Sequence, residues 1–167
     1  MVYNFNAVEV FDIAIKIEEN GKFFYDRGKE IVKDPEVQRL FEELAQEEIK
    51  HKERFESLKS ELPTSAATAT VFDPNHELNL YLKMMADQHV FISSAATRAQ
   101  LDQIKDARSA IKMAMEFEKD SVIFFLSMQE ATEGTKGKEF IGALVKEEQS
   151  HLRRLSMELR KLGAGGS

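Results

Sequence analysis

The sequence of 167 residues contains no cysteine and no tryptophan, and only three prolines and eight glycines. The absence of cysteine excludes disulfides, thiolate zinc sites, iron–sulfur clusters and thiol catalysis. A metal ion would therefore have to be bound by glutamate, aspartate and histidine. Because prolines and glycines are so few, the sequence has little of the punctuation that a β-rich fold needs, and its long periodic runs favour helices.

The chain also lacks an excess of basic residues and any long apolar run. Its formal net charge is −6 and its pI is about 5.3, which argues against nucleic acid or an anionic membrane surface as the main partner. No window of about 18 apolar residues occurs, so no membrane-spanning helix is expected. The N-terminus lacks the basic and then apolar build of a signal peptide. We therefore expect a cytoplasmic protein.

Apolar residues recur at helical spacing in four long stretches, which predicts an all-α fold. The expected helices cover residues 8–33, 35–62, 106–132 and 138–162. Asp34-Pro35-Glu36 separates the first two helices with an N-cap residue, a proline suited to the first turn and an acidic residue. Because this connection is so short, the two helices should pack as antiparallel neighbours.

We expect a single domain, residues 1–167, in which a long crossover joins two helical hairpins. The segments are the first hairpin 8–62, the crossover 63–105, the second hairpin 106–162 and a flexible tail 163–167. Gly163 is the expected C′ residue that ends the last helix. The crossover is long enough to span a bundle, so it should join parallel rather than antiparallel helices. Short helices could form within it at Glu77–Asp87 and Ser94–Leu101.

The two hairpins are related by an internal repeat with a shift of 100 residues and no gap within the helices. Identical residues recur at Ala14/Ala114, Glu18/Glu118, Phe24/Phe124, Leu44/Leu144, Glu47/Glu147, Glu48/Glu148, His51/His151 and Arg54/Arg154. A repeat of this length indicates one helical hairpin used twice. Two such hairpins predict a four-helix bundle with pseudo-twofold symmetry.

Six polar side chains fall on the helix faces that the apolar pattern predicts to be buried. They are Glu18, Glu48 and His51 in the first hairpin, and Glu118, Glu148 and His151 in the second. Each hairpin thus has one Glu on its first helix and an E-x-x-H motif on its second, the ligand arrangement of di-iron and di-manganese carboxylate bundles. A metal-free bundle with a polar core is the alternative. Carboxylates and imidazoles are rarely buried, however, unless something binds them.

Charge also favours a pair of metal ions at the centre of the bundle. Four carboxylates without counter-charge would repel one another, and some would stay protonated with raised pKa values. Two divalent ions would balance them while both imidazoles stay neutral. Carboxylate and imidazole ligands suit iron or manganese, with zinc as a substitute. We expect Glu48 and Glu148 to bridge the two ions, and each of the other four residues to cap one ion.

Other residues near these motifs have plainer interpretations. Glu47 and Glu147 lie beside the predicted buried stripe, as solvated residues or as neighbours of the ligands. His89 falls in the crossover, where a surface or core role is favoured over metal binding. Tyr25 could hydrogen-bond a ligand, relay an electron or only pack, since its repeat mate is Phe125.

Two helix segments and the two E-E-x-x-H motifs resemble the ferritin-like, rubrerythrin-related proteins. The segments are A-I-K-I-E-E-N-G-K-F-F-Y at 14–25 and A-M-E-F-E-K-D-S-V-I-F-F at 114–125, and the motifs begin at Glu47 and Glu147. The resemblance covers both hairpins. It implies a ferritin-like fold with a non-haem di-iron centre and redox chemistry with dioxygen or hydrogen peroxide.

The chain departs from rubrerythrins in two respects. It lacks the cysteine-rich rubredoxin domain that feeds electrons to the centre in that family. It also lacks their additional Glu on the third helix, one turn from the main ligand, because Met115 and Ser121 occupy the turns that flank Glu118. The expected site is therefore more symmetric, with six ligands, and needs an external electron-donor protein.

The expected function is that of a binuclear non-haem iron protein, an oxidoreductase that reduces hydrogen peroxide or dioxygen. The alternatives are a ferroxidase that handles iron within a cage of many subunits, a di-metal hydroxylase with a roomy pocket beside the metals, and a metal-free helical interaction module. We expect a homodimer or higher homo-oligomer, because Val90, Phe91 and Ile92 of the crossover could bury against a second copy. Neither nucleic acid nor a membrane is an expected partner.

Overall fold

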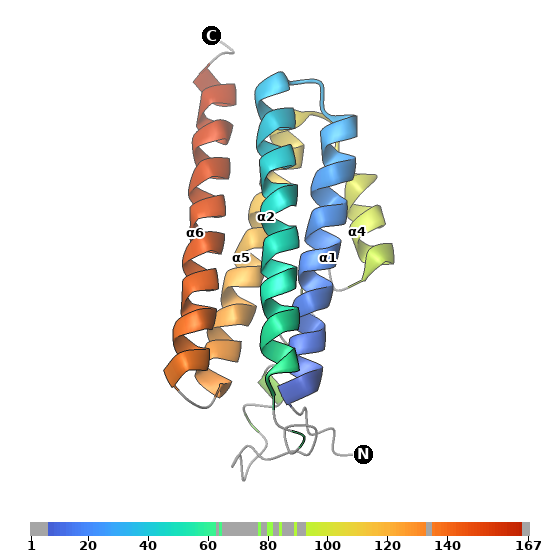
Figure 1. The fold of residues 1–167 in the computed structure, drawn as a ribbon. Helices are drawn as coiled ribbons and strands as arrows, with labels where there is room; N and C mark the ends of the chain where they lie inside the picture. Colours follow the sequence, from blue (N-terminus) through green and yellow to red (C-terminus); the bar gives the residue numbers. More distant parts are fainter. Residues whose placement is uncertain are drawn as a thin grey trace.

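The computed structural model describes residues 7–62, 64, 77, 80, 81, 84, 89, 93–132 and 135–164. Within this part of the chain the fold is all-α. The helices are α1 (Ala7–Ile31), α2 (Pro35–Ser60), α4 (Ser94–Leu101), α5 (Ala107–Ala131) and α6 (Thr135–Ala164). The four long helices form a bundle, and the short α4 packs on the outer side of α1 (Figure 1).

The long helices run up, down, down and up in chain order (Figure 1). α1 packs along α2, and α5 packs along α6, so each hairpin is antiparallel. The hairpins meet where α1 contacts α5 and where α2 contacts α6. Because α2 and α5 run in the same direction, the chain between them has to return along the length of the bundle. The predicted bundle of two hairpins with a crossover between parallel helices is confirmed.

Local sequence sets several helix boundaries as predicted. Asp34 caps α2 by accepting hydrogen bonds from two backbone N–H groups, and Pro35 is the first residue of the helix. Asp106 caps α5 in a reciprocal capping box with Ser109. The short helix expected at Ser94–Leu101 is present with those bounds as α4. These ends are specified by neighbouring residues alone, which is why the sequence predicts them.

The last helix is longer than predicted at both ends. α6 begins at Thr135 rather than near Lys138, and it continues to Ala164, so Gly163 is not the C′ residue that ends it. A glycine inside a helix costs only about 1 kcal/mol relative to alanine, so the exposed Gly163 does not have to end α6. The rest of the predicted tail, residues 165–167, lies outside the described residues.

Two other predictions fall largely outside the described part of the chain. Of the expected helix Glu77–Asp87, the structure describes only Glu77, Leu80, Tyr81 and Met84. Residues 90–92, which were expected to bury against a second copy, are not described. Among the described residues, no helix combines the length and the apolarity needed to cross a membrane.

Aromatic rings pack in two layers that lie on either side of the middle of the bundle. One layer consists of Tyr25, Phe41 and Phe117, and the other consists of Phe11, Phe55 and Phe125. Neighbouring ring centroids within the layers are 5.0–6.2 Å apart, and all six side chains are buried. These rings enclose the space between the layers in apolar surroundings.

Gly21 allows α1 to approach α5 closely. A Cβ atom on this residue would lie only 2.4 Å from Cζ of the Phe117 ring. The ring therefore occupies the space that any other residue at position 21 would need. This contact joins the two hairpins just beside Glu18 and Glu118.

We predict that Gly21→Ala destabilises the protein, because overpacking a core typically costs about 1–3 kcal/mol and outweighs the better helix propensity of alanine. Gly163→Ala is the matched control, since its Cβ would meet Arg108 at an ordinary 3.5 Å. The free energy of unfolding, measured by chemical denaturation, should fall for the first variant and not for the second. Equal stability of Gly21→Ala and the wild type would mean that the Phe117 ring shifts freely.

Candidate metal centre

The six polar side chains that the sequence predicts to be buried converge between the two aromatic layers. Each of them is at most 1% exposed. They are Glu18 on α1, Glu48 and His51 on α2, Glu118 on α5, and Glu148 and His151 on α6. Each E-x-x-H pair lies on one face of its helix because residues three apart are one turn apart. The antiparallel packing of the hairpins then brings these six side chains, from all four long helices, to the same level along the bundle.

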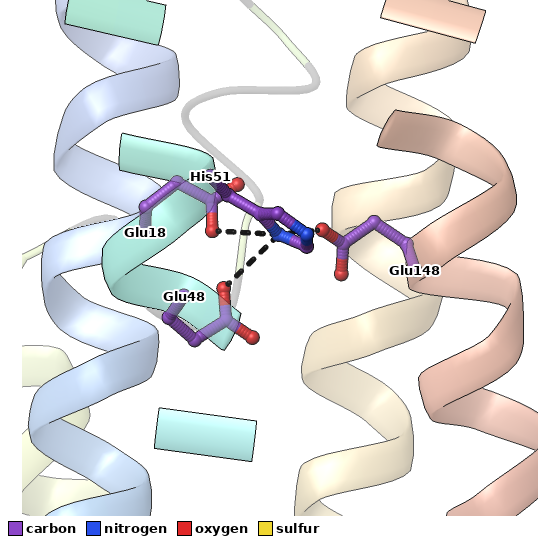
Figure 2. A group of neighbouring side chains, drawn as sticks. All are labelled: Glu18, Glu48, His51 and Glu148. Carbon is purple, nitrogen blue, oxygen red and sulfur yellow. Dashed lines mark ion pairs between the residues drawn. The ribbon is translucent and has the colours of Figure 1, made fainter. Parts of the chain in front are cut away.

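The six side chains form two overlapping groups of candidate metal ligands. Ligand atoms of Glu18, Glu48, His51 and Glu148 lie within 4.8 Å of one another, and so do those of Glu48, Glu118, Glu148 and His151. Figure 2 shows the first group, with the imidazole of His51 between carboxylates from both hairpins. Glu48 and Glu148 belong to both groups. This sharing is the geometry that two bridging carboxylates require.

Both histidines direct Nδ1 into the centre. Nδ1 of His51 lies 2.7 Å from Oε1 of Glu148 and 3.6 Å from Oε2 of Glu18. Nδ1 of His151 lies 3.3 Å from an oxygen of Glu118 and 3.3 Å from an oxygen of Glu148. The two rings stack almost parallel, at 13°, with their centroids 5.4 Å apart. Each imidazole thus presents one nitrogen to the carboxylates.

Most polar atoms at the centre make no hydrogen bond of acceptable geometry in the described structure, even where an ion-pair contact is as short as that between His51 and Glu148. They are both carboxylate oxygens of Glu18, Glu48 and Glu148, Oε2 of Glu118, and Nδ1 of His51 and His151. Buried polar groups in folded proteins are nearly always hydrogen-bonded. A cluster of unpartnered oxygens and nitrogens therefore fits a bound cation. Carboxylate and imidazole are donors that iron, manganese and zinc accept, so the residues present fit a binuclear metal site.

Glu47 and Glu147 contact the histidines of the opposite hairpin. Nε2 of His151 lies 2.7 Å from Oε2 of Glu47, and Nε2 of His51 lies 3.0 Å from Oε2 of Glu147. The sequence places these glutamates beside the buried stripe without identifying this contact. The partner lies on another helix of the other hairpin, and helix periodicity carries no information on such a pairing.

Arginines hold both of these outer carboxylates. Arg154 donates hydrogen bonds to Glu47, and Arg54 donates a hydrogen bond of 2.6 Å to Glu147. The hydrogen bond from His151 is the main reason that the pKa of Glu47 falls to about 2, and Arg154 adds to it. Burial opposes ionisation of Glu147, but Arg54 and the neighbouring histidine outweigh it and lower its pKa. The sequence does contain a signal for these contacts, because the pattern E-E-x-x-H-x-x-R begins at Glu47 and recurs at Glu147.

Tyr25 makes the two halves of the centre unequal. Its hydroxyl donates a hydrogen bond to Oε1 of Glu118, and its ring packs 5.2 Å from that of Phe41. Burial and nearby carboxylates raise the pKa of the Tyr25 phenol, which therefore keeps its proton and remains a donor. The repeat mate Phe125 has no hydroxyl to offer Glu18.

His89 of the crossover segment is buried beside α5. It is 3% exposed, its Nε2 lies 3.2 Å from Oγ of Ser121, and its ring stands edge-on to Phe117 at 5.6 Å. Burial lowers its pKa to about 3, so the ring is neutral near pH 7. The favoured interpretation from the sequence, a surface or core role, agrees with this packed position.

Comparison with known proteins decides the family. The family model for rubrerythrin matches residues 9–159. The chain belongs to the rubrerythrin family. Among solved structures, the fold is similar to that of a protein from Thermotoga maritima described as a ferritin-like diiron-carboxylate protein, with a TM-score of 0.71 and 20% sequence identity over 96% of this chain and 98% of that chain. Among the curated proteins, none is significantly similar in sequence.

This membership confirms the resemblance that the two helix segments and motifs indicated, and the solved structure confirms the ferritin-like fold. The matched region contains both E-E-x-x-H motifs. Family and buried cluster together indicate a metal site. The assignment of six individual ligands, two of them bridging, stays a prediction.

Without metal, this rubrerythrin-family centre retains protons. Burial is the main cause that raises the pKa values of Glu18, Glu48 and Glu118. Glu148 differs, because the two histidines outweigh its burial and lower its pKa. Burial likewise disfavours the charged form of His51, but Glu148 and Glu48 outweigh it and raise the pKa of His51 to about 9. Entering cations must therefore displace protons from the ligands.

We predict that the chelated, metal-free protein loses stability as the pH rises from about 6.5 to about 9. The pKa of His51 is about 9 in the folded state against 6.5 for the unperturbed group, so the folded state binds more protons across this window and its advantage disappears as they dissociate. The melting temperature should fall over this range. With zinc bound the imidazole stays neutral, and this fall should vanish. A flat profile of the chelated protein would contradict the prediction.

Proposed function

We propose that the protein is a binuclear non-haem iron oxidoreductase that reduces hydrogen peroxide or dioxygen. The observation that carries this proposal is the pair of buried ligand groups that share Glu48 and Glu148. Membership of the rubrerythrin family supports it. Manganese or zinc could occupy the same ligands, since donor type alone does not separate these metals.

In this proposal Glu48 and Glu148 would be shared by both ions, and Glu18, His51, Glu118 and His151 would each hold one of them. Bound iron would supply redox electrons and Lewis acidity. Reduction of hydrogen peroxide to two waters consumes two electrons and two protons. The sequence contains no cysteine and thus no rubredoxin-type site, so we assign the electrons to an external donor protein.

The residues of the chain exclude water and bulky molecules from the centre and hold its carboxylates in position. Each of the six side chains is at most 1% exposed, which favours a small oxidant over a bulky organic substrate. The aromatic layers keep bulk water from the carboxylates and so strengthen their interaction with a cation. The Tyr25 hydroxyl holds Oε1 of Glu118 and leaves Oε2 of that carboxylate for a cation.

We also propose that the protein forms a homodimer or a higher homo-oligomer. Ile123 and Leu126 on α5 are each 45% exposed, and a second copy could bury such apolar side chains. A closed cage of many subunits would instead favour the ferroxidase alternative. Native mass separates these two assemblies.

Reaction kinetics test the proposed activity. Protein loaded with ferrous iron is mixed with hydrogen peroxide or with dioxygen, and oxidation of the centre is followed by absorbance. We expect fast oxidation by at least one of the two, and return to the ferrous state when a reductant is supplied. Iron that is oxidised once and then retained as mineral within a large assembly would favour the ferroxidase instead.

We predict that Glu48→Ala or Glu148→Ala abolishes the binuclear site, because each removes a ligand that both ions would share. Elemental analysis should show about two iron ions per wild-type chain and at most one for either variant. Glu116→Ala is the control, since that side chain is 60% exposed and pairs with Lys119 on the outer face of α5. Two ions bound to both bridging variants would refute the ligand assignment.

We predict that iron or manganese raises the melting temperature of the metal-free protein, because only the folded state assembles the ligands. An ion at 100 times its Kd stabilises the fold by about 2.7 kcal/mol. For a chain of this size each kcal/mol shifts Tm by about 2–4 °C. Calorimetry on protein treated with a chelator and then reloaded measures the rise. An unchanged Tm would contradict metal binding at this centre.

A further inference from the structure

Two clusters at the edge of the centre, each of which includes one of its histidines, repeat each other across the pseudo-twofold axis. We term them crossed braces. The first consists of Glu47 on α2 with His151 and Arg154 on α6, and the second consists of Glu147 on α6 with His51 and Arg54 on α2. In each, one carboxylate accepts hydrogen bonds from two donors one turn apart on the facing helix. Every contact of the braces joins one hairpin to the other.

Each brace determines which nitrogen of its histidine carries the proton. An ionised carboxylate only accepts hydrogen bonds, so the Nε2 atom that faces it must donate an N–H. A neutral imidazole then has its lone pair at Nδ1, the nitrogen that faces the carboxylates of the centre. This is the tautomer that can bind a metal ion there.

The arginines keep the carboxylates in place for this contact. Arg54 donates to Oε1 of Glu147 at 2.6 Å, while Oε2 of the same carboxylate faces His51 at 3.0 Å. The two oxygens therefore have separate partners. Glu147 and Glu47 are 43% and 34% exposed, so the braces lie where the α2–α6 contact opens toward solvent, and the histidines behind them are at most 1% exposed.

We propose that Glu47 and Glu147 are positioning residues, each of which sets the tautomer and orientation of the histidine in the opposite hairpin. The inference rests on the proposed function, because it takes both histidines as metal ligands. It adds a dependence between the two halves of the centre. Each histidine is oriented by a glutamate of the opposite hairpin, so it is aligned only when the two hairpins pack together. The ion that this histidine would bind therefore depends on both hairpins.

The chain offers a matched control in the first brace. Arg154 also donates to Glu43, at 2.7 Å, whereas position 143 of the second hairpin is Ala. Removing the Glu43 carboxylate therefore leaves an arrangement like that of the second brace. Glu43→Ala takes away an ion pair with the same arginine but leaves the contact between Glu47 and His151.

Zinc is the probe, because it is diamagnetic and suits nitrogen NMR of the imidazoles. Glu47→Ala should weaken zinc binding about 10–100-fold, measured against a competing chelator, and expose the Nε2 proton of His151 to fast exchange while His51 is unchanged. Glu147→Ala should give the reciprocal result at His51. Glu43→Ala should match the wild type. Glu47→Gln, which keeps an acceptor oxygen, should recover part of the affinity.

Several outcomes would overturn the inference. One is an unchanged zinc affinity and unchanged imidazole signals in both alanine variants, even if their melting temperatures fall, because that result describes a merely structural ion pair. Another is an equal disturbance of both histidines by either variant. If an alanine variant does not fold, Glu47→Leu and Glu147→Leu, which keep a bulky side chain but offer no acceptor oxygen, carry the test, and identical behaviour to the wild type in both measurements would overturn the inference. A wild-type protein that binds no zinc or iron would refute the proposed function as well.

Discussion

The whole bundle depends on how it accommodates carboxylates and imidazoles in a core that excludes water. Taking ionised groups out of water is strongly unfavourable unless other charges compensate them. Here four glutamates and two histidines lie between two layers of aromatic rings, each at most 1% exposed. Protons compensate part of this charge in the metal-free protein, as the raised pKa values of Glu18 and Glu48 indicate. Cations are the other means of compensation, and they also satisfy oxygens that have no hydrogen-bond partner.

The internal repeat explains the shape of the centre, and its imperfections explain why the halves differ. The six candidate ligand positions recur identically in both hairpins. The surrounding rings do not, because Phe41 and Phe55 of the first hairpin correspond to Ile141 and Leu155 of the second. Tyr25 likewise corresponds to Phe125, so within the described residues Glu118 receives a phenolic hydrogen bond and Glu18 does not. A centre built on a symmetric ligand plan thus has an asymmetric environment.

Features that depend on one helix alone could be predicted from the sequence. The period of apolar residues placed Glu48 and His51 on the buried face of α2, and cap residues placed the start of α5 at Asp106. Features that depend on a second helix could not. The contact of Glu47 with His151 needs the register between hairpins, and the buried position of His89 needs the path of the crossover. The predicted end of the last helix at Gly163 was wrong, because one glycine only weakly disfavours a helix and α6 continues through it to Ala164.

The close fit of Phe117 against Gly21 has a consequence for how the site comes together. Gly21 leaves room for the ring, whereas its neighbours Asn20 and Lys22 both carry side chains. The fit of the ring against Gly21 thus contributes to the register of α1 on α5 that places Glu18 and Glu118 in the centre. Cations that bind to such a preorganised set of side chains need not draw the helices into line, so little of their binding free energy is lost to rearrangement.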